Sequence, residues 1–188
     1  MPFYRRVQEQ QLPLKPLGKD ALTLSTKGVN IFFIKNEACF NRDGFYGTPS
    51  GDYGDNLERF SFFSKHALQL LKEIQLSADI VHCHDWQTSL IPVYLKYLYQ
   101  GDPFFKKTKT VLTIHNLAYQ GVFHRDKFFA LGLPSYLNSI EGLEYYGQIS
   151  LLKGGILFSD QITPVSPQYA QEIQSREHGR GLDDRFAR

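Results

Sequence analysis

The sequence predicts an α/β fold in which a mainly parallel β-sheet is flanked by helices. Apolar, strand-like runs alternate with helix-like segments over residues 79–173, which is the pattern of βαβ units. The strand-like runs are apolar almost throughout, as expected for parallel strands covered on both faces. Three of these runs are followed by polar residues, namely histidine, asparagine, aspartate or serine. Open parallel sheets bind ligands beyond the carboxyl ends of their strands.

The composition is that of an ordinary globular protein. The chain has 188 residues, of which 42% are hydrophobic and 21% charged, so it can form one domain or part of a larger one. The net charge is +2 without any block of like charges, which argues against nucleic acid and anionic membrane as partners. Cys39 and Cys83 lie far apart and show no metal-site spacing, so we expect reduced thiols in a cytoplasmic protein. No run is apolar for the length of a membrane span, and the N-terminus lacks the apolar stretch of a signal peptide.

The N-terminal part predicts a lead-in and a strand pair. Residues 1–20 are polar and contain three prolines, so we expect an irregular lead-in to a partial domain that spans residues 21–188. The alternating run 21–26 and the apolar run 29–36 flank Gly28. This arrangement predicts two strands joined by a turn.

A long loop and an amphipathic helix come next. Residues 41–56 contain four glycines and one proline, which predicts a loop, and a long ordered loop is often functional. Asp55 or Asn56 can cap the helix that follows. Its expected buried stripe consists of Phe60, Phe63, Ala67, Leu70, Leu71 and Ile74.

The rest of the chain supplies the sheet and its covering helices. We expect strands at residues 79–83, 110–115 and 160–166. We expect helices at residues 88–100 and 146–159, and a further helix that starts at Pro167.

Polar side chains gather at the ends of the three predicted strands. His84-Asp85-Trp86-Gln87 follows the first strand, His115-Asn116 the second and Ser166-Pro167 the third. Because the carboxyl ends of parallel strands meet at one edge, we expect these groups to face one crevice. Gly121 is expected to let the chain turn away without crowding a bound ligand.

Each of these residues also has a purely structural explanation. Asp85 can cap the next helix, and Trp86 can be a packed core residue. His115 can be a core histidine with a satisfied hydrogen bond, and Asn116 can brace the turn. These alternatives stay open from the residue pattern.

Metal and nucleotide motifs receive little support. His82, His84 and Asp85 are ligand types, but a zinc site needs three or four well-placed ligands. The glycine-rich nicotinamide and P-loop motifs and the serine-hydrolase motif do not occur. Lys153-Gly154-Gly155 lies in a helical pattern, where small residues favour close packing over phosphate contact.

Several ordered stretches resemble the N-terminal domain of bacterial glycogen synthases and plant starch synthases. The resemblance covers roughly residues 30–186, and its order makes it specific. The stretches are NRDGFYG (41–47), YGDNLERFSFFSKHAL (53–68), DIVHCHDWQTSLIPVYLK (79–96), TVLTIHNLAYQGVF (110–123), LLKGGILFSDQITPVSPQYAQEI (151–173) and GRGLDDRF (179–186).

The resemblance implies a GT-B glycosyltransferase with two Rossmann-like domains around a cleft, of which this chain is the N-terminal half. It implies a retaining enzyme that moves glucose from a nucleotide sugar, usually ADP-glucose, to an α-1,4-glucan, without a metal or other cofactor. By this resemblance His115 is the catalytic residue that contacts the sugar near its reacting carbon. The implied substrate-binding residues are Tyr46, Asp85, Trp86, Asn116, Tyr119 and Ser166.

Two departures from the family pattern shape the expectations. The family's Lys-x-Gly-Gly-Leu loop, which meets the donor phosphates, is not found, and neither is a C-terminal domain. We therefore expect a truncated piece with negligible transferase activity by itself, weak glucan binding, and self-association through an open sheet edge. A stand-alone glucan-binding module is the alternative. We expect the compartment to be the cytoplasm, or the plastid stroma for a plant protein.

Overall fold

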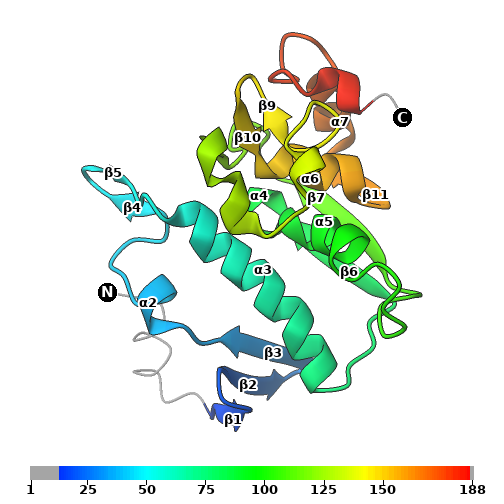
Figure 1. The fold of residues 1–188 in the computed structure, drawn as a ribbon. Coiled ribbons are helices and arrows are strands. Elements are labelled where there is room, and N and C mark those ends of the chain that lie inside the picture. The colour runs from blue at the N-terminus through cyan, green and yellow to red at the C-terminus, as the bar shows by residue number, and fades with distance from the viewer. Residues whose placement is uncertain (1–12, 187–188) are drawn as a thin grey trace. The chain divides into compact units, whose positions relative to one another are not determined.

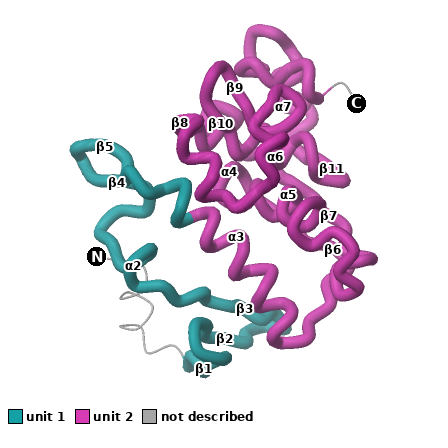
Figure 2. The backbone as a smooth tube through the Cα atoms, in the orientation of Figure 1, with its two compact units in different colours: residues 1–59 teal, residues 60–188 magenta. Residues whose placement is uncertain are grey.

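The computed structural model describes residues 13–186, which fall into two compact units. Figure 1 shows the elements along the chain and Figure 2 the two units. The first unit ends at Arg59 and the second begins at Phe60, so the boundary lies within helix α3 (Asn56–Glu73). Each unit is described by itself below.

The first unit contains a three-stranded antiparallel sheet. Its strands, in the order β1-β2-β3, are β1 (Lys15–Leu17), β2 (Ala21–Thr26) and β3 (Val29–Ile34). Lys27 (φ 50°) and Gly28 (φ 79°) form the two-residue connection between β2 and β3. Positive φ at both positions matches the twist of a tight hairpin, which confirms the strand pair predicted around Gly28.

Strand β1 lies within the segment expected to be irregular. It pairs with β2 although it contains Pro16, which has no N–H to donate. Strand β1 is at the end of this sheet order, and an edge strand needs only one side of its backbone for pairing. Three prolines therefore do not exclude a short edge strand.

The glycine-rich loop is ordered by its own contacts. It follows α2 (Glu37–Phe40) and contains the short strands β4 (Gly47–Thr48) and β5 (Gly51–Asp52). A Cβ atom on Gly47 would lie 2.3 Å from the carbonyl oxygen of Gly51, so the hairpin requires glycine there. Arg42 binds both carboxylate oxygens of Asp55, at 2.8 and 2.5 Å, and this ion pair joins the two ends of the loop.

Helix α3 forms where expected but buries a different face. Its buried positions are Asn56, Leu57, Arg59, Ser61, Ser64, Leu68 and Leu70, whereas most of the expected apolar stripe is only half-buried. Within the second unit, the hydroxyl groups of Ser61 and Tyr94 are 2.8 Å apart. Small serines with a hydrogen-bond partner can be buried as completely as leucine, and this partner is invisible in the periodicity.

The second unit is built on a parallel sheet with the order β11-β7-β6. The strands are β6 (Ile80–His84), β7 (Lys109–Ile114) and β11 (Gln161–Pro164). This arrangement confirms the three predicted parallel strands. Burial is high in the central strand β7 and lower in β6 and β11, because each of those has only β7 beside it among the described strands. Among these three strands, the expected burial on both faces of the sheet is therefore found in β7.

Helices α4 (Asp85–Thr88), α5 (Leu90–Tyr97), α6 (Leu151–Phe158) and α7 (Pro167–Ile173) accompany the sheet. Helix α7 starts as predicted, with Pro167 in its first turn and the Ser166 hydroxyl accepting from the Tyr169 N–H. Short 3₁₀ helices lie at Arg125–Leu131, Ser135–Leu137 and Asp183–Arg185.

The helix expected at residues 146–159 begins later, at Leu151. Residues before it form a small antiparallel sheet of β8 (Val122–His124), β10 (Gln148–Ser150) and β9 (Glu144–Tyr145). The Ser150 hydroxyl then caps α6 by accepting from the Lys153 N–H. The apolar pattern continues through both elements, so the cap rather than the periodicity marks the helix start.

Close packing explains the Lys153-Gly154-Gly155 run, as predicted. A Cβ atom on Gly155 would lie 2.6 Å from the Ser89 hydroxyl oxygen and 2.9 Å from a methyl carbon of Leu112. The ammonium group of buried Lys153 donates to the carbonyl oxygens of Ile140 and Glu144, and burial lowers its pKa. Packing at Gly155 and the hydrogen bonds of Lys153 therefore engage this run within the second unit.

Within residues 13–186, no helix combines the length and apolar character that crossing a membrane requires.

Asp160 joins the starts of β7 and β11 and should make stability depend on acid pH. Its carboxylate accepts from the Lys109 ammonium, the Thr110 N–H and the Thr110 hydroxyl at 2.8–2.9 Å. Burial raises the pKa of Asp160, but these bonds outweigh burial and leave the pKa below its ordinary value. The stabilisation is present above about pH 4 and is lost as the pH falls through the lowered pKa.

We expect Asp160→Asn to lower the free energy of unfolding at pH 7 and to lose this deficit at low pH. Urea denaturation of both proteins between pH 7 and pH 2 measures the difference. A deficit that stayed constant over this range would contradict the assigned ion pair.

Candidate active site

Two of the three polar strand ends are in direct contact. The Asp85 carboxylate accepts a hydrogen bond from the His115 backbone N–H at 2.7 Å, and the rings of His84 and His115 approach to 3.0 Å between Nδ1 and Nε2. Strands β6 and β7 are neighbours in parallel register, with His84 opposite Thr113, which places both ends at one edge. Asp85 thus holds the His115 backbone and His84 holds the His115 ring, while the residue stays exposed to solvent.

Asp85 supports the loop after β7 and does not cap α4. It is the first residue of α4, and the capping position belongs to His84. Its φ of +55° is left-handed, which is uncommon for a residue other than glycine and costs stability. This conformation turns the carboxylate toward the neighbouring strand end, so the local strain serves the contact with His115.

The hydrogen bond between the two imidazoles needs complementary ring nitrogens. Burial, followed by the nearby His82 and His115, lowers the pKa of His84, so His84 is neutral at pH 7. A hydrogen bond between His84 Nδ1 and His115 Nε2 needs a hydrogen on one of these nitrogens and a lone pair on the other.

The third strand end braces the same loop through helix α7. The Leu117 N–H donates to the Tyr169 hydroxyl at 2.7 Å. The Asn116 side chain accepts from the Ala118 N–H at 2.9 Å, and the exposed Ser166 caps α7. Asn116 thus braces its own turn and is an exposed residue.

Trp86 packs inside the unit. It is 8% exposed, and its ring meets those of Phe60 and Phe123 at centroid distances of 4.7 and 5.9 Å. Gly121 has a φ of +59°, and a Cβ atom there would lie 2.5 Å from the Trp86 ring. The structure therefore gives Gly121 a different task from the one expected: it makes room for the tryptophan.

The two remaining expected site residues are exposed tyrosines. Tyr119 is 68% exposed on the loop that follows His115. Tyr46 is 45% exposed and belongs to the first unit, where its carbonyl oxygen accepts from Asn56 and from the Tyr53 N–H. The substrate contacts of all these residues stay predictions.

Sequence reasoning missed the residues beside the His115 loop. A hollow of about 440 Å³ is lined by Ala118, Gln120, Val122, Tyr145, Tyr146, Arg180 and Gly181. Gln120 is 7% exposed and donates to the Arg180 carbonyl oxygen at 3.1 Å, which ties segments 60 residues apart. The paired tyrosines before Gly147 and the glycines around Arg180 were the available signals.

The histidines of β6 are engaged with protein groups. His82 Nε2 lies 2.7 Å from the Thr113 hydroxyl oxygen. His84 Nδ1 lies 3.0 Å from His115 Nε2. Among residues 13–186 the structure contains no cluster of three or more metal-ligating side chains. Cys83 is a buried free thiol, and burial raises its pKa to about 12.

Comparison with known proteins gives consistent results. A family model described as the starch synthase catalytic domain matches residues 1–188. Glycogen synthase 2 of Geobacter sulfurreducens is 45% identical over 202 residues, which cover 100% of this chain and 42% of that protein. The glycogen synthase of Thermotoga maritima is 52% identical over 155 residues, which cover 82% of this chain and 31% of that protein.

A solved structure shares the fold. The catalytic domain of starch synthase IV from Arabidopsis thaliana, bound to ADP and acarbose, superposes with a TM-score of 0.81 at 30% identity. The match covers 92% of this chain and 38% of that one. This likeness confirms the predicted Rossmann-like half of a GT-B glycosyltransferase. The chain spans less than half the length of these relatives.

Proposed function

Because the chain belongs to the starch synthase catalytic-domain family, we propose that it is the acceptor-side part of a glycogen or starch synthase. The reaction is transfer of glucose from ADP-glucose to the non-reducing end of an α-1,4-glucan with retention of configuration. The observation that carries the proposal is the fixed position of His115. Asp85 holds its backbone and His84 its ring at the carboxyl end of β7.

His115 takes the catalytic role in this proposal, as a polar group beside the reacting carbon of the sugar. Preorganised polar groups act strongly on developing charge because they need not reorient during the reaction. Asn116 and Tyr119 lie on the loop that follows His115, and Ser166 caps helix α7, which braces this loop. These three residues are assigned to sugar contacts, as are Asp85 and Tyr46. Trp86 is 8% exposed, so its assigned contribution to the site is to support the loop by packing against Gly121.

Donor binding requires groups outside this set. Departure of a nucleotide diphosphate needs fixed positive charge at the cleft. In the hollow beside the His115 loop, the charged residue among the described lining is Arg180. We therefore expect the isolated chain to bind glucan weakly and to transfer no measurable glucose. Cytoplasmic location and self-association through the β6 edge, where Ile80 is 60% exposed, also stay predictions.

A chimeric synthase tests the function. This chain replaces the matching segment of the Thermotoga maritima glycogen synthase, and incorporation of labelled glucose into glycogen is measured with ADP-glucose and UDP-glucose. We expect incorporation from ADP-glucose by the chimera and none by the 188-residue chain. A folded chimera that transfers glucose from neither donor would contradict the proposal, and glucan binding without transfer would favour a stand-alone binding module.

A further inference from the structure

We infer that Tyr146 is an aromatic platform that binds a glucan segment beside the reacting sugar. The inference rests on the proposed function for the choice of a glucan as ligand. Tyr146 is 77% exposed and lies at the turn between β9 and β10. It is not among the site residues expected from the sequence.

The backbone at Tyr146 is strained. Tyr146 has a φ of +47° and Gly147 a φ of +77°, so both central residues of this hairpin turn are left-handed. Glycine, asparagine and aspartate are preferred in such turns, and tyrosine is disfavoured. An exposed aromatic residue that costs stability points to a task for its side chain.

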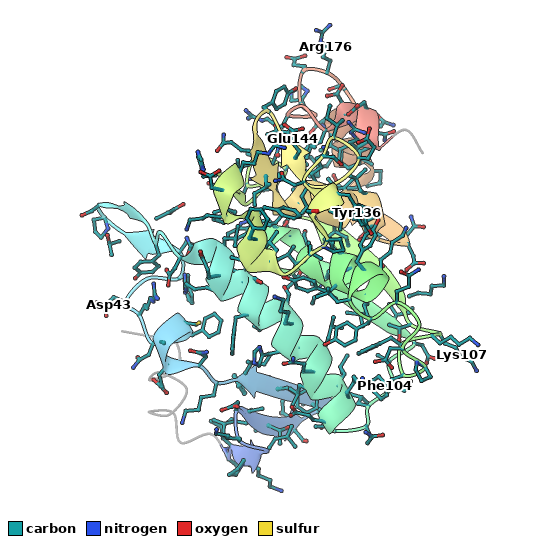
Figure 3. The ribbon with its side chains drawn as sticks, in the orientation of Figure 1. Asp43, Phe104, Lys107, Tyr136, Glu144 and Arg176 are labelled. Carbon is teal, nitrogen blue, oxygen red and sulfur yellow. The ribbon has the colours of Figure 1, made fainter. Side chains whose placement is uncertain are left out.

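The position of the Tyr146 ring is fixed by its neighbours. Tyr145 meets it edge-on, with ring centroids 4.8 Å apart, and the Tyr145 hydroxyl donates to the Arg180 carbonyl oxygen. A Cβ atom on Gly181 would lie 2.9 Å from the Tyr146 ring, so the backbone there lies against the tyrosine. The Gly147 N–H donates to Glu144, which is labelled in Figure 3, and this bond supports the turn.

Hollows of about 440 and 630 Å³ are both lined by Tyr145, Tyr146 and Gly181. The smaller hollow also includes Ala118, three residues after His115, so the two Cα atoms lie within about 11 Å by chain length. A chain of sugars with one end at His115 can therefore continue to Tyr146.

The lining of the smaller hollow fits a neutral sugar chain. Arg180 is its one charged side chain, and the other lining groups are aromatic, aliphatic, amide or glycine. Aromatic rings offer a flat apolar face, and the C–H face of a pyranose is a suitable partner, while the tyrosine hydroxyl and the Arg180 guanidinium can bond sugar hydroxyls. A strongly anionic ligand would call for several cations at this place.

The test compares four forms of the 188-residue chain in titrations with maltoheptaose: the parent, Tyr146→Asn, Tyr146→Phe and Tyr136→Asn. Tyr136, labelled in Figure 3, is 64% exposed and does not line either hollow, so it is the matched control. We expect Tyr146→Asn to weaken binding about three- to tenfold, the range that one aromatic contact supplies. Tyr146→Phe and Tyr136→Asn should bind like the parent.

Thermal unfolding distinguishes this result from misfolding. Asparagine suits a left-handed turn position, so Tyr146→Asn should unfold at a higher temperature than the parent while it binds less glucan. Unchanged affinity in Tyr146→Asn would overturn the inference. Absence of glucan binding in the parent chain would also overturn it, yet leave the proposed function intact if the chimera transfers glucose. An inactive chimera together with Tyr146-dependent binding would support the platform and overturn the transferase proposal.

Discussion

Replacing His115 by alanine is expected to lower glucose transfer by the chimeric synthase about 100- to 1,000-fold, the usual cost of removing one preorganised polar group from a reacting centre. The residue is exposed, so its ring supports no core. The Asp85 carboxylate bonds the backbone N–H of position 115, which alanine retains. The loss should therefore appear in kcat, with the unfolding midpoint nearly unchanged.

Two further variants assign the effect to the ring at this position. His124→Ala removes another exposed histidine of the same unit, with a side chain 72% exposed, and should leave transfer unchanged. His84→Ala removes the partner of the His115 ring and should give an intermediate loss, because the ring is then free to rotate. Full activity in His115→Ala would exclude the catalytic role assigned to this residue.

Replacing Gly155 by valine is expected to prevent folding of the second unit. The first added carbon would already lie 2.6 Å from the Ser89 hydroxyl oxygen, 2.7 Å from the Ser89 Cβ atom and 2.9 Å from Leu112. These atoms belong to the helix junction and to the central strand β7, which have little freedom to move. Overpacking costs about 1–3 kcal/mol of stability for small additions. Three extra carbons at this contact should cost more, which is a large part of the total stability of about 5–15 kcal/mol of a domain.

Urea denaturation followed by circular dichroism measures this effect, with Gly54→Val as the control. A Cβ atom on Gly54 would meet no atom within 4 Å, so its unfolding free energy should change by less than about 0.5 kcal/mol. Gly155→Ala should fall between the two. A stable, cooperatively folded Gly155→Val protein would show that α6 can move away from β7, contrary to the packing described.

Elements whose signals are local could be predicted from the amino-acid chain alone. The apolar runs of β6, β7 and β11 and the intervening helices predicted a parallel sheet, because crossover connections leave few other arrangements. Gly28 predicted the β2–β3 turn, and Pro167 predicted the start of α7. At these two places, one or two residues carry the whole physical requirement.

The partner of each polar group could be identified only in the folded protein. The sequence offered Asp85 as a helix cap or a ligand contact, and only the neighbouring strand showed that its carboxylate holds the His115 backbone. Likewise, Ser61 of α3 is buried with a hydrogen-bond partner, the Tyr94 hydroxyl, that lies 33 residues away in the chain. Hydrogen bonds and steric contacts between distant segments leave no periodic trace in the chain, because they depend on strand register and loop conformation.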